Sequence, residues 1–197
     1  MSLEQMIAES LTRADFVQIP GYLSPAEVGS LVSDFEQARA RGEFSRAAVG
    51  RGGTREIRDE VRRDEILWLE PTRLSEPQKR LWERLELLKN ELNAGLFLGL
   101  WSLEGHYAQY PPGGFYERHV DRFRDDDKRT VSVVLYLNQA WAPGDGGELE
   151  IFHVDGSTLI EPRAGTLVCF MSDSVEHAVR PSKKDRRSFA GWFRRRG

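Results

Sequence analysis

Hydrophobic and polar residues follow different periods in the two halves of this chain. In residues 24–42 and 75–96, apolar residues recur about every 3.6 positions, which is the period of an amphipathic helix. Both segments begin with serine and have proline in the first turn, and Glu27 follows Ser24 by three residues. These are signals of a helix start, so we expect two helices. Apolar runs at 15–23 and 65–71 predict short strands.

From residue 103 onward the pattern becomes one of short strands separated by turn residues. The predicted strands are 103–110, 115–121, 129–138, 147–154, 157–162, 165–170, 176–181 and 187–194. Eight strands at this spacing are typical of a β-sandwich or jelly roll. We therefore expect a mainly β protein, a double-stranded β-helix (jelly roll) with flanking N-terminal α-helices packed on one sheet.

Residues 43–63 fit neither pattern. They contain six arginines and three glycines but few large apolar residues. Such a segment is typical of a mobile lid and not of a hinge between domains. We therefore expect residues 1–197 to form a single domain, in which residues 1–100 support a jelly-roll core of residues 101–197.

Composition and charge narrow the class of protein. The chain is 40% apolar and 30% charged, as expected of a globular protein with a core. A net charge of -3 gives no reason to expect binding to nucleic acid or to a membrane. The longest apolar run, 94–101, is too short to span a bilayer, and residues 1–10 lack the pattern of a signal peptide. With Cys169 as the single cysteine, we expect a soluble protein in the reducing cytoplasm.

The word HVD occurs twice, at 119–121 and at 153–155. A histidine two positions before an aspartate places both side chains on one face of a strand, where they can bind the same metal ion. At the second site glycine follows the aspartate, and Asp-Gly is a strong signal of a hairpin turn. Because the turn accounts for Asp155, we expect His153 to be an exposed histidine and not a ligand.

His119 stands in a different context. It lies near the end of a predicted strand and before the polar segment 122–128, so His119 and Asp121 would lie at the mouth of a sheet. His177 lies near the start of another strand, and a jelly roll can make these two strands neighbours although four others separate them. Two histidines and one carboxylate form the facial triad of non-haem Fe(II) oxygenases, which leaves positions for substrate and oxygen.

Two adjacent arginines, Arg186 and Arg187, stand at the start of the last predicted strand, where alternation places them on opposite faces. Arg186 shares its face with the small residues Ser188 and Ala190, which leave room for a ligand. Arg187 shares its face with Phe189, which indicates packing against the helices. Since arginine can bind a carboxylate through two parallel hydrogen bonds, we expect Arg186 to bind a distal carboxylate, with Arg187 as the alternative.

Taken together, these motifs resemble the Fe(II)/2-oxoglutarate-dependent dioxygenases. The resemblance covers residues 60–195 and rests on HVD at 119–121, YLN at 136–138, GGELEIF at 146–152, His177, and RRSFAGWF at 186–193. The stretch VRRDEILWLE at 61–70 is similar to the prolyl 4-hydroxylase branch, and within it to the oxygen-sensing prolyl hydroxylases and their bacterial relatives.

The resemblance implies roles for individual residues. The implied iron ligands are His119, Asp121 and His177. The implied cosubstrate residues are Arg186 and Tyr136, which would bind the far carboxylate of 2-oxoglutarate, together with Tyr110, Trp192, Leu149 and Val179. The implied lid residues are Arg62, Asp64 and Arg129, the last two of which match a polar pair. His106 departs from the pattern, because the closest animal enzymes carry an apolar residue there.

The resemblance also implies a reaction. Fe(II), 2-oxoglutarate and O2 would hydroxylate a prolyl residue of a protein substrate, with succinate and CO2 as coproducts and ascorbate as a supporting reductant. The charges in 43–63 and 122–128 suit an extended peptide across the mouth. The bacterial relatives indicate the translation machinery as a target class.

Three other functions stay open at this point. A hydroxylase of a free amino acid or another small molecule would carry the same metal site. A nucleic-acid demethylase of the same superfamily would use the eight lysines and arginines in 180–196 to contact phosphates, although the chain is acidic overall. A cupin-like binding module would bind metal without a use for Arg186 or Tyr136.

Overall fold

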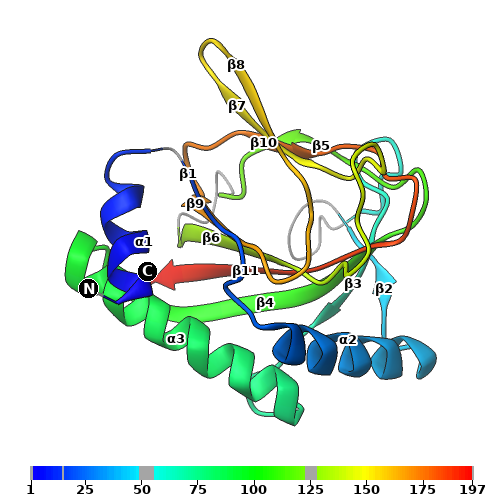
Figure 1. Ribbon diagram of the computed structural model, residues 1–197, viewed down its shortest axis with the longest axis horizontal. Helices are drawn as coiled ribbons and strands as arrows, with labels where there is room; N and C mark the ends of the chain where they lie inside the picture. The colour runs from blue at the N-terminus through cyan, green and yellow to red at the C-terminus, as the bar shows by residue number, and fades with distance from the viewer. Residues whose placement is uncertain (1, 15, 49–55, 123–127, 197) are drawn as a thin grey trace.

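The computed structural model describes residues 2–14, 16–48, 56–122 and 128–196. Two antiparallel sheets face one another, and helices pack against the outer side of the larger sheet (Figure 1). The mainly β, jelly-roll fold expected from the sequence is confirmed.

The larger sheet runs through the centre of the molecule. Its strands are β1 (Phe16–Ile19), β2 (Ser45–Arg46), β3 (Glu65–Trp68), β4 (Leu100–Tyr110), β6 (Arg129–Tyr136), β9 (Leu167–Met171) and β11 (Arg186–Arg195). They lie in the order β1-β9-β6-β11-β4-β3-β2, and each neighbouring pair is antiparallel. The long strands β4, β6 and β11 therefore form the middle of this sheet.

The smaller sheet covers part of the inner face of the larger one. Its strands are β5 (Tyr116–His119), β7 (Leu149–His153), β8 (Gly156–Ile160) and β10 (His177–Val179). They lie in the order β5-β10-β7-β8, and the β7–β8 hairpin projects beyond the body of the molecule (Figure 1). Four strands separate β5 from β10 in the chain, yet the two are paired.

The helices begin where local capping signals place them. They are α1 (Leu3–Leu11), α2 (Pro25–Ala40) and α3 (Glu76–Leu96). Each follows a serine whose hydroxyl accepts from the third helical N–H, while the side chain of that third residue bonds back to the cap. Helices α2 and α3 were expected, but α1 was not, although Ser2 and Gln5 carry its capping box. No helix in the described ranges is long and apolar enough to cross a bilayer.

The packing of the helices on the larger sheet explains why apolar side chains occupy alternate positions of β6. Leu85 and Leu92 of α3 share one buried cluster with Val131 and Val133 of β6, so odd-numbered positions of this strand face the helices. Even-numbered positions face the smaller sheet, because successive side chains of a strand point to opposite faces. The residue between the two valines, Ser132, therefore faces the space between the sheets.

The expected lid is described only in part. Residues 49–55 of the segment 43–63 lie outside the described residues, as do residues 123–127 of the neighbouring loop. The C-terminal end of the lid is bonded to the strand region before His119, where Arg63 N donates to Phe115 O at 2.9 Å. The mobility of the lid stays a prediction.

Candidate active site

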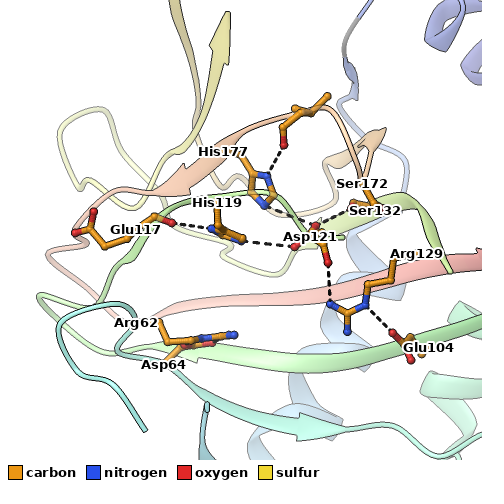
Figure 2. A network of polar contacts seen from close by, with 11 residues as sticks. Arg62, Asp64, Glu104, Glu117, His119, Asp121, Arg129, Ser132, Ser172 and His177 are labelled. Carbon is orange, nitrogen blue, oxygen red and sulfur yellow. Dashed lines mark hydrogen bonds and ion pairs between the residues drawn. The ribbon is translucent and has the colours of Figure 1, made fainter. Parts of the chain in front are cut away.

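Three residues with metal-ligating side chains meet at the end of the smaller sheet. The β5–β10 pairing places His119 directly opposite His177, and Asp121 lies two residues beyond His119. One ligand atom from each residue lies within 4.8 Å of the others (Figure 2). His119 Nε2 is 3.5 Å from Asp121 Oδ1, and His177 Nε2 is 3.7 Å from Asp121 Oδ2. The predicted triad residues are thus brought together.

Hydrogen bonds orient both imidazole rings toward this shared space. His119 Nδ1 lies 2.7 Å from the carbonyl oxygen of Glu117, and His177 Nδ1 lies 3.1 Å from that of Val175 (Figure 2). Because a carbonyl oxygen only accepts, each Nδ1 carries a proton, and in the neutral ring Nε2 then presents its lone pair to the shared space. This is the tautomer that binds a metal through Nε2.

Burial and charge favour the protonation states that a metal site needs. Burial alone would raise the pKa of Asp121, but His177 together with hydrogen bonds to His119 and Ser132 holds that pKa well below its usual value. Burial lowers the pKa of His177 to about 4, with Asp121 acting in the opposite direction. Near neutral pH the site therefore offers a carboxylate and a neutral imidazole, as metal binding requires.

The second HVD does not join this cluster. His153 pairs with Gly156 across a two-residue turn formed by Val154 and Asp155, so the expected hairpin is present but its turn lies one residue before Asp-Gly. His153 Nε2 is 3.0 Å from Thr158 Oγ1. Contrary to expectation, His153 is only half-buried and not exposed, because the ring of Phe16 stacks on it.

A cavity of about 310 Å³ lies between the sheets and includes the triad on its wall. The other predicted site residues that line it are Tyr110, Leu149, Val179, Arg186, Trp192, Arg62 and Arg129. Two predicted residues, Tyr136 and Asp64, are buried behind this wall and do not line it. The cavity therefore joins the triad and Arg186 in one space.

Arg186 is held within the wall of this cavity. It is 1% exposed, and its Nε donates to the carbonyl oxygen of Gly147 at 2.7 Å. Gly147 has φ +70°, and a Cβ there would lie 3.1 Å from Arg186 Cδ, so glycine suits both the turn and the close approach. Within the described part of the chain, no carboxylate pairs with Arg186, although a buried cation normally has a partner.

Two tyrosines flank this arginine. The guanidinium carbon of Arg186 lies 5.0 Å from the ring centre of Tyr110 and 5.2 Å from that of Tyr136. Burial raises the pKa of Tyr136 to about 12 and also raises that of Tyr110, so both phenols stay protonated near neutral pH. The Tyr136 hydroxyl is buried without a hydrogen-bond partner among the described residues. A buried guanidinium that has no carboxylate partner among the described residues, beside a buried phenol, fits the carboxylate of a bound ligand.

Arg187 faces the opposite way. Its guanidinium forms an ion pair of 2.8 Å with Glu36 of α2 and lies 6.0 Å from the ring of Phe35. Its backbone N–H donates to the side chain of Asn138. Strand alternation thus places Arg186 in the cavity and Arg187 against a helix.

The polar pair expected beside the lid has a different composition. Asp64 accepts from Arg62 Nε at 2.7 Å and from Arg62 Nη2 at 2.5 Å, so both of its oxygens bond to Arg62 and not to Arg129. Arg129 Nε instead donates to Glu104 at 2.7 Å (Figure 2). The guanidinium carbon of Arg129 also lies 3.6 Å from the ring centre of Trp192. The expected pair of Asp64 with Arg129 is therefore wrong, because β3 and β6 are not neighbours in the sheet.

An aromatic wall beside the triad was not predicted. The His106 ring lies 4.9 Å from that of Trp68 and 5.4 Å from that of Trp192, and all three residues line the cavity. Tyr116, which also lines the cavity, stacks on His119 with ring centres 3.6 Å apart. The available signal was strand alternation, which places positions 104, 106, 108 and 110 on one face.

The buried His106 leads to a prediction for acid stability. Burial, assisted by Arg62, lowers its pKa to about 3, whereas an unfolded histidine titrates near 6.5. The unfolded chain therefore binds more protons between these values, and the free energy of unfolding falls as the pH falls through this window, by up to about 1.4 kcal/mol per pH unit from this residue. We expect the free energy of unfolding of His106→Leu to depend less steeply on pH than that of the parent.

Urea unfolding of the metal-free parent and of His106→Leu, compared between about pH 7 and pH 5, measures this difference. His177 contributes to both proteins, so the difference between the two slopes isolates His106. If the free energy of unfolding changes equally with pH in the two proteins, the prediction is wrong.

A jelly roll with two histidines and one aspartate on a cavity wall is typical of the non-haem iron oxygenases. Residues 105–194 match the model of the 2OG-Fe(II) oxygenase superfamily. A prolyl-4-hydroxylase of Pseudomonas putida is 41% identical, with a TM-score of 0.89 over 99% of this chain and 100% of that one. The chain belongs to the 2OG-Fe(II) oxygenase superfamily, in its prolyl 4-hydroxylase branch.

Two other solved structures are similar to this chain. A prolyl hydroxylase of Trichoplax adhaerens, in complex with a peptide fragment of the hypoxia inducible factor oxygen degradation domain, is 26% identical, with a TM-score of 0.87 over 98% of this chain and 89% of that one. A prolyl 4-hydroxylase of Phytophthora capsici is 22% identical, with a TM-score of 0.77 over 96% of this chain and 62% of that one, and shares the fold. The family expected from the sequence motifs is confirmed.

Proposed function

We propose that this dioxygenase hydroxylates a prolyl residue within a protein substrate. The observation that carries the proposal is a single cavity lined both by the triad and by Arg186, a buried cation with no carboxylate partner in the described ranges. The similarity to the Pseudomonas putida enzyme supports a prolyl target. The similarity to the Trichoplax adhaerens enzyme, described with a bound peptide fragment, supports a protein substrate.

In this proposal His119, Asp121 and His177 would hold Fe(II), since both imidazoles are oriented and the carboxylate of Asp121 and the imidazole of His177 are in the required protonation state. Arg186 would hold the far carboxylate of 2-oxoglutarate, with the phenol of Tyr136 donating a hydrogen bond. When bound, Fe(II) and 2-oxoglutarate supply the oxidising chemistry, in which one atom of O2 enters the prolyl C–H bond as hydroxyl, the other enters succinate, and CO2 leaves.

The chain itself contributes orientation and exclusion of water. Leu149 and Val179 are buried on the cavity wall that also carries Arg186, so a cosubstrate there would lie against apolar surface. Since the bound groups activate oxygen, no side chain is needed as a general base to remove a proton from carbon. This agrees with a cavity in which the described acids are the ligand Asp121 and Glu104, which is paired with two arginines.

The aromatic wall is where the prolyl ring would bind. Trp68 is 41% exposed and lies next to His106 and Trp192 on the same side of the cavity. Flat aromatic faces suit the apolar ring of proline, which offers no N–H when it is within a peptide. The Arg62–Asp64 pair lies at the C-terminal end of the lid segment, where the chain flanking the proline would lie.

The cellular setting is part of the same proposal. We place the enzyme in the cytoplasm, supported by its single buried cysteine. Its target class would be the translation machinery, and ascorbate would act as a supporting reductant.

The test is hydroxylation of peptides under labelled oxygen. The enzyme, Fe(II) and 2-oxoglutarate would be incubated under ¹⁸O2 with peptides from a cytoplasmic digest, followed by mass spectrometry and measurement of succinate. We expect one labelled oxygen on proline and succinate formation that the peptides stimulate. His119→Ala and a peptide with proline replaced by alanine are the controls. Stimulation by free amino acids but not by any peptide would support the small-molecule hydroxylase instead.

A further inference from the structure

Ser132 is a hydroxyl residue at a buried position in the middle of a strand. It lies in β6 between Val131 and Val133 and is 1% exposed. Burying a hydroxyl costs free energy unless it is hydrogen-bonded, and serine is not a strong strand former. Its presence in the centre of the larger sheet therefore calls for a partner.

That partner is the carboxylate of the triad. Ser132 Oγ donates to Asp121 Oδ2 at 2.6 Å, and Ser172 Oγ lies 2.8 Å from Ser132 Oγ (Figure 2). Because Ser132 has a single hydroxyl proton and gives it to the carboxylate, Ser172 must be the donor in the second bond. The two bonds form a directed relay from Ser172 through Ser132 to Asp121, in which each bond polarises the next.

The relay joins a loop residue to the most extensively paired part of the fold. Ser132 lies in β6, which is bonded on both sides to β9 and β11, and Ser172 directly follows β9. Asp121 lies outside any strand, in a bend beyond the end of β5. Arg122, which follows Asp121, is also bonded to the segment after β9. Its N–H donates to Ser172 O and its guanidinium pairs with Asp173, both at 2.9 Å.

We infer that Ser132 and Ser172 are positioning residues for the metal carboxylate: they orient Asp121 before metal binds. A short hydrogen bond between a hydroxyl and a carboxylate restricts the plane of the carboxylate, so less conformational freedom is lost when the metal arrives. The inference rests on the metal-binding role proposed above for His119, Asp121 and His177, and it does not depend on the prolyl substrate.

The test is Co(II) binding by metal-free parent, Ser132→Ala, Ser172→Ala and the double variant. Outer-shell partners of metal ligands typically contribute about 10- to 100-fold to affinity, so we expect Ser132→Ala to raise the Kd for Co(II) by this factor and to change the visible Co(II) spectrum. Ser172→Ala should have a smaller effect in the same direction. Since both act through one carboxylate, the double variant should match Ser132→Ala.

The matched control is Thr130→Val, which removes a hydroxyl two residues earlier on β6. Thr130 Oγ1 donates to the carbonyl oxygen of Lys128 at 3.0 Å, so its loss should leave the Co(II) Kd and spectrum unchanged. Thermal unfolding without metal separates a loss of fold stability from a loss of metal affinity. If Ser132→Ala does not fold, Ser172→Ala carries the test by the same readout.

Two results would overturn the inference, and they are distinguishable. If the parent binds Co(II) and Ser132→Ala binds it with the same Kd and spectrum, the relay has no positioning role while the proposed metal site stands. If neither the parent nor any variant binds Co(II), the proposed metal site itself fails, and the relay fails with it.

Discussion

Replacing His119 by alanine is expected to abolish the visible charge-transfer band that Fe(II) and 2-oxoglutarate produce together in the anaerobic enzyme. The imidazole of His119 is oriented by Glu117 and lies within 4.8 Å of the other two candidate ligands. Loss of an outer-shell partner alone costs about 10- to 100-fold in metal affinity. Loss of a ligand should therefore weaken Fe(II) binding by more than about a hundredfold and leave no detectable turnover.

His153→Ala is the matched control, because it removes the histidine of the other HVD word. His153 lies in the β7–β8 hairpin, bonded to Thr158 and outside the cavity. The variant should keep the band, its Fe(II) dependence and turnover. A band that survives His119→Ala but disappears in His153→Ala would place the metal at the second word, in conflict with the structure.

Replacing Arg186 by glutamine should weaken 2-oxoglutarate binding far more than any change at Arg187. Removing one partner of a buried, hydrogen-bonded charge pair typically costs about 2–5 kcal/mol, which is about 30-fold to several thousand-fold in affinity. Arg186 is 1% exposed and lines the cavity. Arg187 instead pairs with Glu36 near the surface, and such pairs contribute about 0–1 kcal/mol. We expect Arg187→Gln to leave the Kd for 2-oxoglutarate unchanged.

Calorimetric titration of 2-oxoglutarate into the Mn(II)-loaded parent and variants measures the affinity for 2-oxoglutarate without turnover. Arg186→Lys is a second variant, which keeps the charge but not the planar fork, and should recover only part of the affinity. Thermal unfolding checks that loss of the bond from Arg186 to Gly147 has not disrupted the fold. Equal affinities of Arg186→Gln and the parent would remove Arg186 from the cosubstrate site.

Local patterns predicted most of the secondary structure. Ser24 and Ser75 mark helix starts because the cap is a contact within four residues, and the structure shows both capping boxes. The prediction omitted α1, although Ser2 and Gln5 give it the same kind of cap. Its nine residues make it a short helix whose stability depends on packing against α3, and no local pattern contains that packing.

Strand counting also predicted a non-local pairing. Four strands separate those carrying His119 and His177, and in a jelly roll this connectivity makes them neighbours. Alternation then separated Arg186 from Arg187, because successive strand residues point to opposite faces. The sequence did not predict the hydrogen-bond partners of individual side chains. The carboxylate of Asp64, for example, bonds to Arg62 and not to Arg129.

The order of residues was thus sufficient for the helix starts, the alternation of the strands, the family and the choice of the first HVD word. Three-dimensional packing was needed to bring Ser132 and Ser172 to Asp121, to enclose His106 between two tryptophans and to leave Arg186 without a carboxylate partner among the described residues. The physical reason is the separation in sequence between the residues that determine each feature. A cap or a strand face depends on residues a few positions apart, whereas a hydrogen-bond partner, a pKa or a cavity depends on which distant strands come into contact.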